Sequence, residues 1–110
     1  MPLLGSFEQL LLFSVLQLGD GAYGVSIREN IEDRTGRAVS IGAIYTTLGR
    51  LEERGLVRSR TESPRGRSGR PRKYYRLTPE GARDLRASYD TIRTRAGGLM
   101  PALDRLAEGP

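Results

Sequence analysis

Apolar residues recur at three- and four-residue steps in the first half of the chain, which predicts a series of helices. Ser6 and Gln9 form a capping-box pattern ahead of the apolar run 10–18, so Ser6 is expected to cap a first helix that is buried on most sides. A second helix is expected over 24–35, with Gly36 ending it in a left-handed turn.

A third helix is expected to follow the capping residue Ser40 and to end at Gly55. Its inner positions are apolar: Ile41, Ile44, Tyr45, Leu48 and Leu51. Its outer positions are nearly all small: Gly42, Ala43, Thr46, Thr47, Gly49 and Arg50. A glycine inside a helix costs about 1 kcal/mol relative to alanine, so these glycines suggest that another molecule approaches the helix backbone closely.

The second half of the chain predicts a hairpin followed by a long helix. Residues 56–61 and 73–77 are expected to be strands, joined by a polar, basic loop over 62–72. Thr78-Pro79-Glu80 supplies a cap, a first-turn proline and an acid, so a fourth helix is expected from there to about Met100. The resulting fold class is mainly α (α+β), in the order helix, helix, helix, hairpin, helix.

Positive charge is concentrated in one part of the chain. Of the 18 basic residues, nine lie between Arg54 and Arg76, where Glu62 is the one acid, so this segment carries +8 and the rest of the chain −3. A compact basic block favours a phosphate polymer as partner, because binding releases the polymer's counterions. The alternative is a basic loop that serves solubility alone.

Composition argues against an enzyme, a metal site or a membrane span. The chain contains neither Cys nor His, so thiolates, disulfides, imidazole bases and the commonest zinc ligands are excluded, and no cofactor is expected. The pairs Glu32/Asp33 and Glu52/Glu53 are sequence neighbours and point apart on a helix. The apolar run is too short for a membrane, and no export signal precedes it, so a cytoplasmic location is expected.

A GxGxxG pattern over 19–24 suggests a dinucleotide-binding enzyme instead. That alternative conflicts with its context, because a predicted helix rather than a strand precedes the pattern. With 110 residues, the chain is also too short to form a doubly wound sheet.

A short helix, a turn and a second helix with a small polar outer face are typical of a helix-turn-helix that places one helix in the DNA major groove. The stretches SIGAIYTTLGRLEERGLV at 40–57 and GRPRKYYRLTPEG at 69–81 resemble the PadR family of winged-helix regulators, as does AYGVSIRENIE upstream. The resemblance covers about residues 6–90. It implies a winged helix-turn-helix dimer, similar to the short-tailed branch of the family, that represses transcription from double-stranded DNA.

By position, the resemblance implies a DNA-binding set on the third helix and the loop: Ser40, Gly42, Ala43, Tyr45, Thr46, Arg50, Arg65, Arg67, Arg70, Arg72 and Lys73. Arg50 is the best candidate for a guanine contact, although a solvated charge or an ion pair near Glu53 is the alternative. Tyr45 is either a phosphate contact or a core aromatic. Gly69-Arg70-Pro71 resembles the core of an AT-hook, but a general phosphate-binding wing is the stronger interpretation.

The fourth helix is expected to mediate dimerisation. Its apolar positions keep a three-four spacing, and the set expected at the interface is Leu85, Tyr89, Ile92, Ala96 and Leu99. The first helix of the same chain is an alternative partner for this stripe, and both contacts can coexist. The expected division is therefore a DNA-binding domain over 1–78 and a dimerisation helix and tail over 79–110.

The sequence departs from the family at several outer positions. Ile41 and Thr46 stand where relatives often have proline, and Gly49 where they often have Lys or Asp, which affects base preference and not fold. Some relatives hold flat aromatic compounds with tryptophan between the subunits. Because this chain has no Trp, a drug-like effector has no support, and any small-molecule effector stays unknown. A non-regulatory nucleic-acid binder or a protein-interaction module with the same fold is the remaining alternative.

Overall fold

Helices, a short 3-10 turn and one antiparallel hairpin follow one another in the computed structural model, which describes residues 3–63 and 71–109. In chain order they are α1 (Ser6–Leu18), η1 (Gly19–Gly21), α2 (Gly24–Thr35), α3 (Ile41–Glu53), β1 (Val57–Glu62), β2 (Arg72–Leu77), α4 (Pro79–Ala96) and α5 (Met100–Glu108). The predicted order of helices and hairpin is confirmed, with one additional helix at the end.

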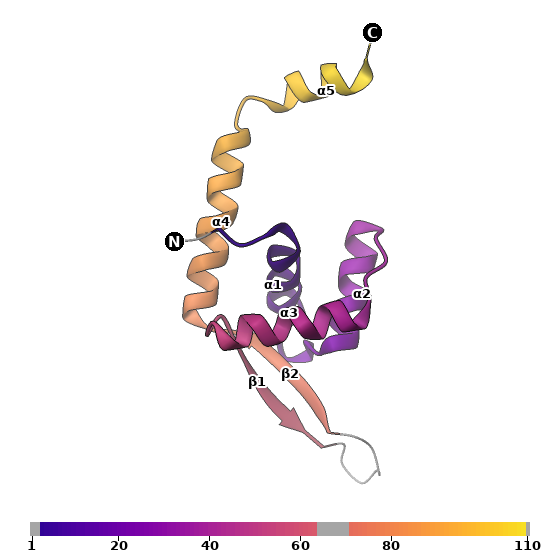
Figure 1. Ribbon diagram of the computed structural model, residues 1–110, viewed down its shortest axis with the longest axis vertical. Coiled ribbons are helices and arrows are strands. Elements are labelled where there is room, and N and C mark those ends of the chain that lie inside the picture. The colour runs from indigo at the N-terminus through magenta and orange to yellow at the C-terminus, as the bar shows by residue number, and fades with distance from the viewer. Residues whose placement is uncertain (1–2, 64–70, 110) are drawn as a thin grey trace.

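The core lies where α1, α2 and α3 meet the hairpin and the first turns of α4 (Figure 1). Its buried apolar side chains come from every one of these elements: Leu4, Leu11, Leu12, Val15, Ala22, Ile27, Ile31, Ile44, Leu48, Leu51, Leu56, Val57, Tyr75 and Leu85. In Figure 1, α3 crosses in front of the lower parts of α1 and α2, and the hairpin extends beyond it on the side opposite to α5.

Most helix ends follow the sequence signals. Ser40 Oγ accepts a hydrogen bond from the Ala43 N–H at 3.1 Å, and Gly36 ends α2 with φ 70° in the left-handed region. The start of α1 differs from the prediction: Gly5 is the N-cap, and its N–H donates to Oε1 of Glu8 at 2.9 Å. The box therefore uses Glu8, whose carboxylate also suits the positive end of the helix dipole, and not the predicted pair.

The first helix is less buried than its apolar sequence predicts. Leu11, Leu12 and Val15 lie in the core, whereas Leu10, Phe13 and Leu16 are exposed. One helix cannot bury all of its sides in a chain of this size, because too few other elements are available to cover them. The single chain thus leaves an apolar face of α1 open to solvent.

The hairpin pairs β1 with β2 from Val57 opposite Leu77 to Glu62 opposite Arg72, close to the predicted strand limits. Because side chains alternate along a strand, Tyr75 is buried in the core while Tyr74 lies on the outer face. A short bridge pairs Tyr23 with Tyr74, and the Tyr75 N–H donates to the Ala22 carbonyl at 2.8 Å. Residues 22–23 thereby act as a third, minimal strand.

The fourth helix ends earlier than predicted: α4 stops at Ala96 rather than near Met100, and a separate helix, α5, begins at Met100 in the expected tail. Gly97 and Gly98 lie between them, and Gly98 has φ 79°, a conformation that favours glycine. Pro101 then lies in the first turn of α5, where its missing N–H has no partner to lose. The apolar spacing continues through this break in the sequence, but the helix does not.

Candidate nucleic-acid interface

The exposed side of α3 carries the residues expected to face DNA. Ile44, Leu48 and Leu51 anchor the helix in the core, and the opposite side is open. On that side lie the exposed α3 residues of the expected DNA-binding set, together with Gly49. They are Gly42, Ala43, Tyr45, Thr46, Gly49 and Arg50. Four of these six residues, all but Tyr45 and Arg50, are Gly, Ala or Thr, which are small enough for the helix to enter a major groove with its backbone close to the bases.

Neither glycine on this side is required by packing within the chain. Among residues 3–63 and 71–109, a Cβ built at Gly42 or at Gly49 would meet no other group within 4 Å, and neither residue has a positive φ. Glycine in a helix interior without a neighbour lowers stability and gains nothing inside the protein. The open space above the α3 backbone is therefore suited to an external partner.

Tyr45 lies at the border between the core and this surface. Its side chain is 47% exposed, and its ring and hydroxyl lie so close to Gly24 that a Cβ there would overlap them. Gly24 is the first residue of α2, so Tyr45 links α3 to the N-terminus of α2. The interpretation of Tyr45 as an ordinary core aromatic is wrong, and its contact with phosphate stays a prediction.

A stack of two tyrosine rings, each with an arginine over it, connects the hairpin to the start of α2. The rings of Tyr23 and Tyr74 meet edge to face at 5.5 Å, the Arg72 guanidinium lies 4.2 Å from the centre of Tyr23, and that of Arg60 lies 4.8 Å from the centre of Tyr74. Arg60 also donates to the Asp20 carbonyl at 3.2 Å. The stack holds Arg72, an exposed member of the expected DNA-binding set, at the loop end of the hairpin.

Lys73 points to the other face of the hairpin, where it pairs with an acid of α3. Its Nζ lies 3.3 Å from Glu52 Oε1, and Ser59 Oγ donates to Glu52 Oε2 at 2.5 Å. The hydrogen bond from Ser59, together with Lys73, lowers the pKa of the Glu52 carboxyl below its ordinary value. The structure thus gives Lys73 a contact between β2 and α3, and its predicted DNA contact competes with this ion pair.

The hairpin also carries cations that sequence reasoning did not select. Arg58 and Arg76 lie directly opposite each other in the register, exposed, on the same outer face as Arg60 and Tyr74. Strand alternation contained this signal, because Arg58 and Arg60 are two residues apart in β1 and Arg76 is two residues from Tyr74. The expected contacts Arg65, Arg67 and Arg70 lie outside the described residues.

Comparison with known proteins identifies the family. The sequence profile of the Transcriptional regulator PadR-like family matches residues 12–87. A PadR family transcription regulator from Clostridium difficile R20291 has 30% sequence identity and a TM-score of 0.71, and the match covers 89% of this chain and 99% of that one. The chain belongs to the PadR-like family of transcriptional regulators.

Two further solved structures of transcriptional regulators are similar to this chain. A padr family transcriptional regulator from Eggerthella lenta DSM 2243 has 29% identity and a TM-score of 0.64, with 93% of this chain and 84% of that one covered. A transcriptional regulator from Clostridium thermocellum has 26% identity and a TM-score of 0.68, with 81% and 84% covered. A search of curated proteins finds none that matches the chain.

Membership of the PadR-like family settles the choice between regulator and enzyme, since PadR proteins are DNA-binding regulators and not enzymes. The GxGxxG glycines agree with this, because Gly19 and Gly21 lie in the 3-10 turn that follows α1 rather than a strand. No group of three acidic residues in ranges 3–63 and 71–109 is arranged to hold a metal ion. None of the helices in the described part of the PadR chain is long and apolar enough to cross a membrane.

The PadR chain divides the expected dimerisation set between its own core and its surface. Leu85 is only 3% exposed and packs inside the single chain, so its side chain is already covered. Tyr89, Ile92 and Leu99 are about half exposed, and Ala96 is half-buried. The ring of Phe13 on α1 meets that of Tyr89 at 5.8 Å, beside an apolar groove of about 500 Å³ between α1 and α4.

Proposed function

We propose that this PadR-family chain binds a specific inverted-repeat operator in double-stranded DNA as a homodimer and represses transcription. The observation that carries the proposal is the open, small-residue side of α3, which lies on the same side of the molecule as the arginine-rich hairpin (Figure 1). A helix with this surface fits the major groove, while the neighbouring cations supply affinity for phosphates without reading sequence.

Base recognition is assigned to Arg50. It is exposed on the same side of α3 as Gly42 and Gly49, and no ion pair holds it among the described residues. The alternative pairing with Glu53 therefore has no support in the structure. An arginine free to extend from such a helix can make a bidentate contact with guanine O6 and N7.

Dimerisation is assigned to residues 79–110, with 1–78 as the DNA-binding part. The first turns of α4 pack into the core through Gly81, Leu85 and Ser88, but the later apolar residues Tyr89 and Ile92 remain exposed. A second copy related by a two-fold axis covers such a stripe with its own. Two recognition helices on that axis would read half-sites about 34 Å apart, which is one turn of DNA.

Repression requires only that the dimer occupy a promoter tightly enough to exclude other proteins. Each chain offers one reading helix and one basic hairpin, so the proposed homodimer would hold two of each for tight occupancy. Direct occupancy is therefore the simplest regulatory mechanism for this architecture.

The test begins with selection of bound sites from a random duplex library, followed by titration of the selected palindrome, a half-site and random DNA. Arg50→Ala should lower affinity for the palindrome by about 1 to 3 kcal/mol and relax the preference at one base-pair position. Arg83→Ala, at an exposed arginine on α4, is the matched control and should change neither. Recovery of no common site, or binding of protein partners instead of DNA, would support the alternative of a non-regulatory or protein-interaction module.

A further inference from the structure

The terminal helix α5 is amphipathic and stands clear of the rest of its own chain (Figure 1). Met100, Leu103 and Leu106 are all more than half exposed, and no residue of α5 is buried. A helix of nine residues is far too short to be stable in water by itself. Its apolar face therefore requires a surface on which to pack.

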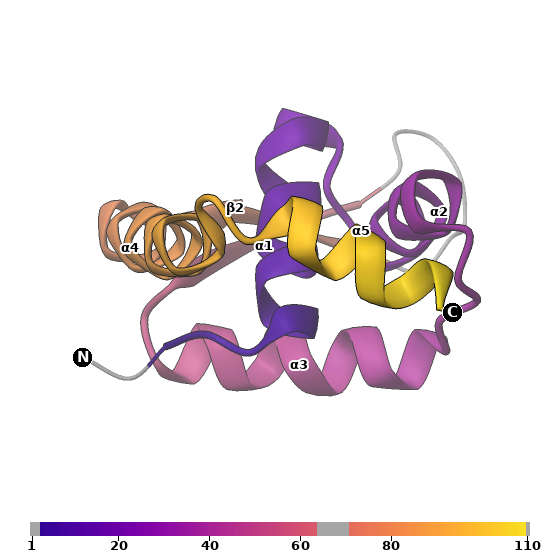
Figure 2. The same cartoon turned by 90° about the horizontal axis from the view of Figure 1, so that it is seen from above.

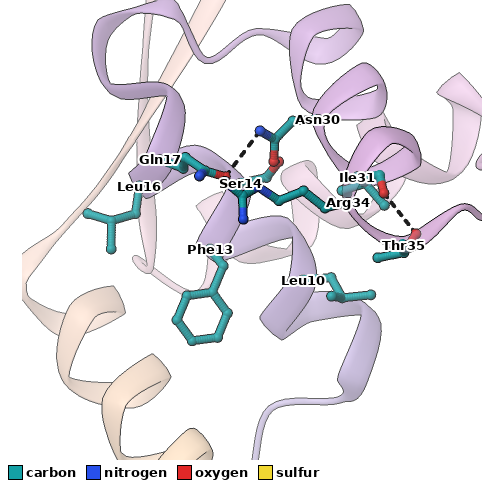
Figure 3. Close-up of a pocket in the computed structure, with 9 residues that line it drawn as sticks. All are labelled: Leu10, Phe13, Ser14, Leu16, Gln17, Asn30, Ile31, Arg34 and Thr35. Atoms are coloured by element: carbon teal, nitrogen blue, oxygen red, sulfur yellow. Dashed lines mark hydrogen bonds between the residues drawn. The ribbon is translucent and has the colours of Figure 1, made fainter.

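An apolar groove between α1 and α2 is open in the same chain. The α1–α2 groove is formed by Leu10, Phe13 and Leu16 of α1 and by Ile31, Arg34 and Thr35 of α2, with a volume of about 320 Å³. Figure 3 shows Arg34 extending from α2 towards α1, above the exposed apolar side chains. The floor is closed by hydrogen bonds of Asn30 to Ser14 and to Gln17.

We propose that α5 of each subunit packs into the α1–α2 groove of the partner subunit, an inference that rests on the proposed homodimer. The two surfaces are complementary in charge as well as in apolarity. Asp104 and Glu108 lie one turn apart along one edge of the α5 apolar face, and Arg34 lies at the groove, with Arg37 close by at the end of α2. None of these four side chains has an ion-pair partner among residues 3–63 and 71–109.

The course of α4 favours the partner's groove over the chain's own groove. Ser88 is the last buried residue of α4, and the helix continues to Ala96, about 12 Å further along its axis. Seen along the long axis in Figure 2, α5 then turns away from α4, at the end of the molecule remote from the hairpin. Gly97 and Gly98 set this turn, and α5 runs across the line of its own α1 towards α2 (Figure 2) without burying any of its residues there.

Continuity of the apolar surface on α1 points to the same occupant. Phe13 and Leu16 line both the α1–α4 groove beside Tyr89 and the α1–α2 groove. A partner whose α4 covers the first groove would have its α5 delivered to the second, across a single apolar face of α1. A second copy of this chain is thus the occupant that uses both unpartnered surfaces at once.

Disulfide trapping tests this placement, because the chain has no native cysteine. The double variant Arg34→Cys/Asp104→Cys, oxidised under mild conditions, should run as a covalent dimer on a non-reducing gel. The matched control Arg34→Cys/Arg105→Cys moves the second thiol to the other side of α5 and should cross-link several-fold less. An intrachain bond, seen as a monomer without free thiols, would overturn the proposal, and so would cross-linking equal to the control.

Two further measurements distinguish failure of this inference from failure of the proposed function. One is a charge exchange between Arg34 and Asp104, and the other is the molar mass of the wild-type protein in solution. Arg34→Glu and Asp104→Arg should each raise the dimer dissociation constant by about threefold to tenfold, and the double exchange should restore it. Additive losses would overturn the pairing. A wild-type monomer by light scattering would overturn the homodimer and α5 placement together, whereas a stable dimer without the trapped bond would overturn only the placement of α5.

Discussion

Gly49→Ala should make the protein more stable and a weaker DNA binder at the same time. Gly49 lies inside α3, and no group in the described part of the chain lies within 4 Å of an added Cβ, so alanine fits there without any rearrangement. Alanine in a helix interior is favoured over glycine by about 1 kcal/mol, because it loses less backbone entropy on folding. The same methyl group would project from the open side of α3 into the space assigned to the DNA major groove.

The expected magnitudes are measurable by standard means. A gain of about 1 kcal/mol should raise the melting temperature by about 4 °C in a domain of this size. If the helix backbone approaches the bases closely, the methyl group should lower affinity for the selected operator about tenfold, which is about 1.4 kcal/mol. Thermal unfolding and operator titration on the same preparation give both values.

Gly81→Ala is the matched control, since it makes the same substitution in another helix. A Cβ at Gly81 would lie 2.9 Å from the Leu56 carbonyl carbon and closer still to its oxygen, so the backbone must shift. That substitution should destabilise the protein by about 1 to 3 kcal/mol despite the gain in helix propensity. The reasoning fails if Gly49→Ala is not stabilising, or if it binds the operator as tightly as the wild type.

Three further substitutions test separate parts of the structure. Ile92→Asp places a charge in the exposed α4 stripe and should give a monomer by light scattering that binds half-sites only weakly; a variant that remains dimeric contradicts the proposed interface. Tyr23→Leu removes the ring beneath Arg72 and should lower the slope of log K for DNA binding against log salt concentration by up to about 0.9. Tyr23→Phe keeps a ring there and should keep the wild-type slope. Equal slopes for both variants would exclude the stack from DNA binding. The lowered pKa of Glu52 means that its contacts stabilise the fold above the ordinary value of 4.5 and cease to do so as the pH falls through the lower folded-state value. Glu52→Gln should therefore be less stable than the wild type at pH 7 in denaturant unfolding, and the difference should close in acid; a difference independent of pH would contradict this.

Local signals predicted most of the DNA-binding part because they act within a few residues. The caps Ser40 and Thr78 and the left-handed Gly36 each depend on a hydrogen bond or a torsion close by in the chain, and each lies where the sequence placed it. The alternation of Tyr74 and Tyr75 likewise needs only the geometry of one strand.

The features that sequence reasoning missed depend on distant partners or on competing local signals. The pairing of Tyr23 with Tyr74 joins residues about fifty positions apart, and no periodicity reports it. The break at Gly97 was hidden by apolar spacing that continues into α5, because spacing reports which side of a helix is apolar and not whether the helix is continuous. The exposed side of α1 could not be separated from its buried side, since both are apolar.

The motif at 78–81 joins the reading helix to the dimerisation helix through a single cluster of backbone contacts. Thr78 Oγ1 donates to the Gly55 carbonyl just after α3 at 2.6 Å and accepts from the Gly81 N–H at 3.0 Å. The Thr78 N–H donates to the Leu56 carbonyl at 3.1 Å, against which Gly81 packs without room for a side chain. The direction of α4 is therefore fixed relative to α3 by short contacts rather than by a flexible linker. In a homodimer built on α4, this rigid junction would set the spacing and tilt of the two reading helices, so operator geometry would depend on residues that touch no DNA.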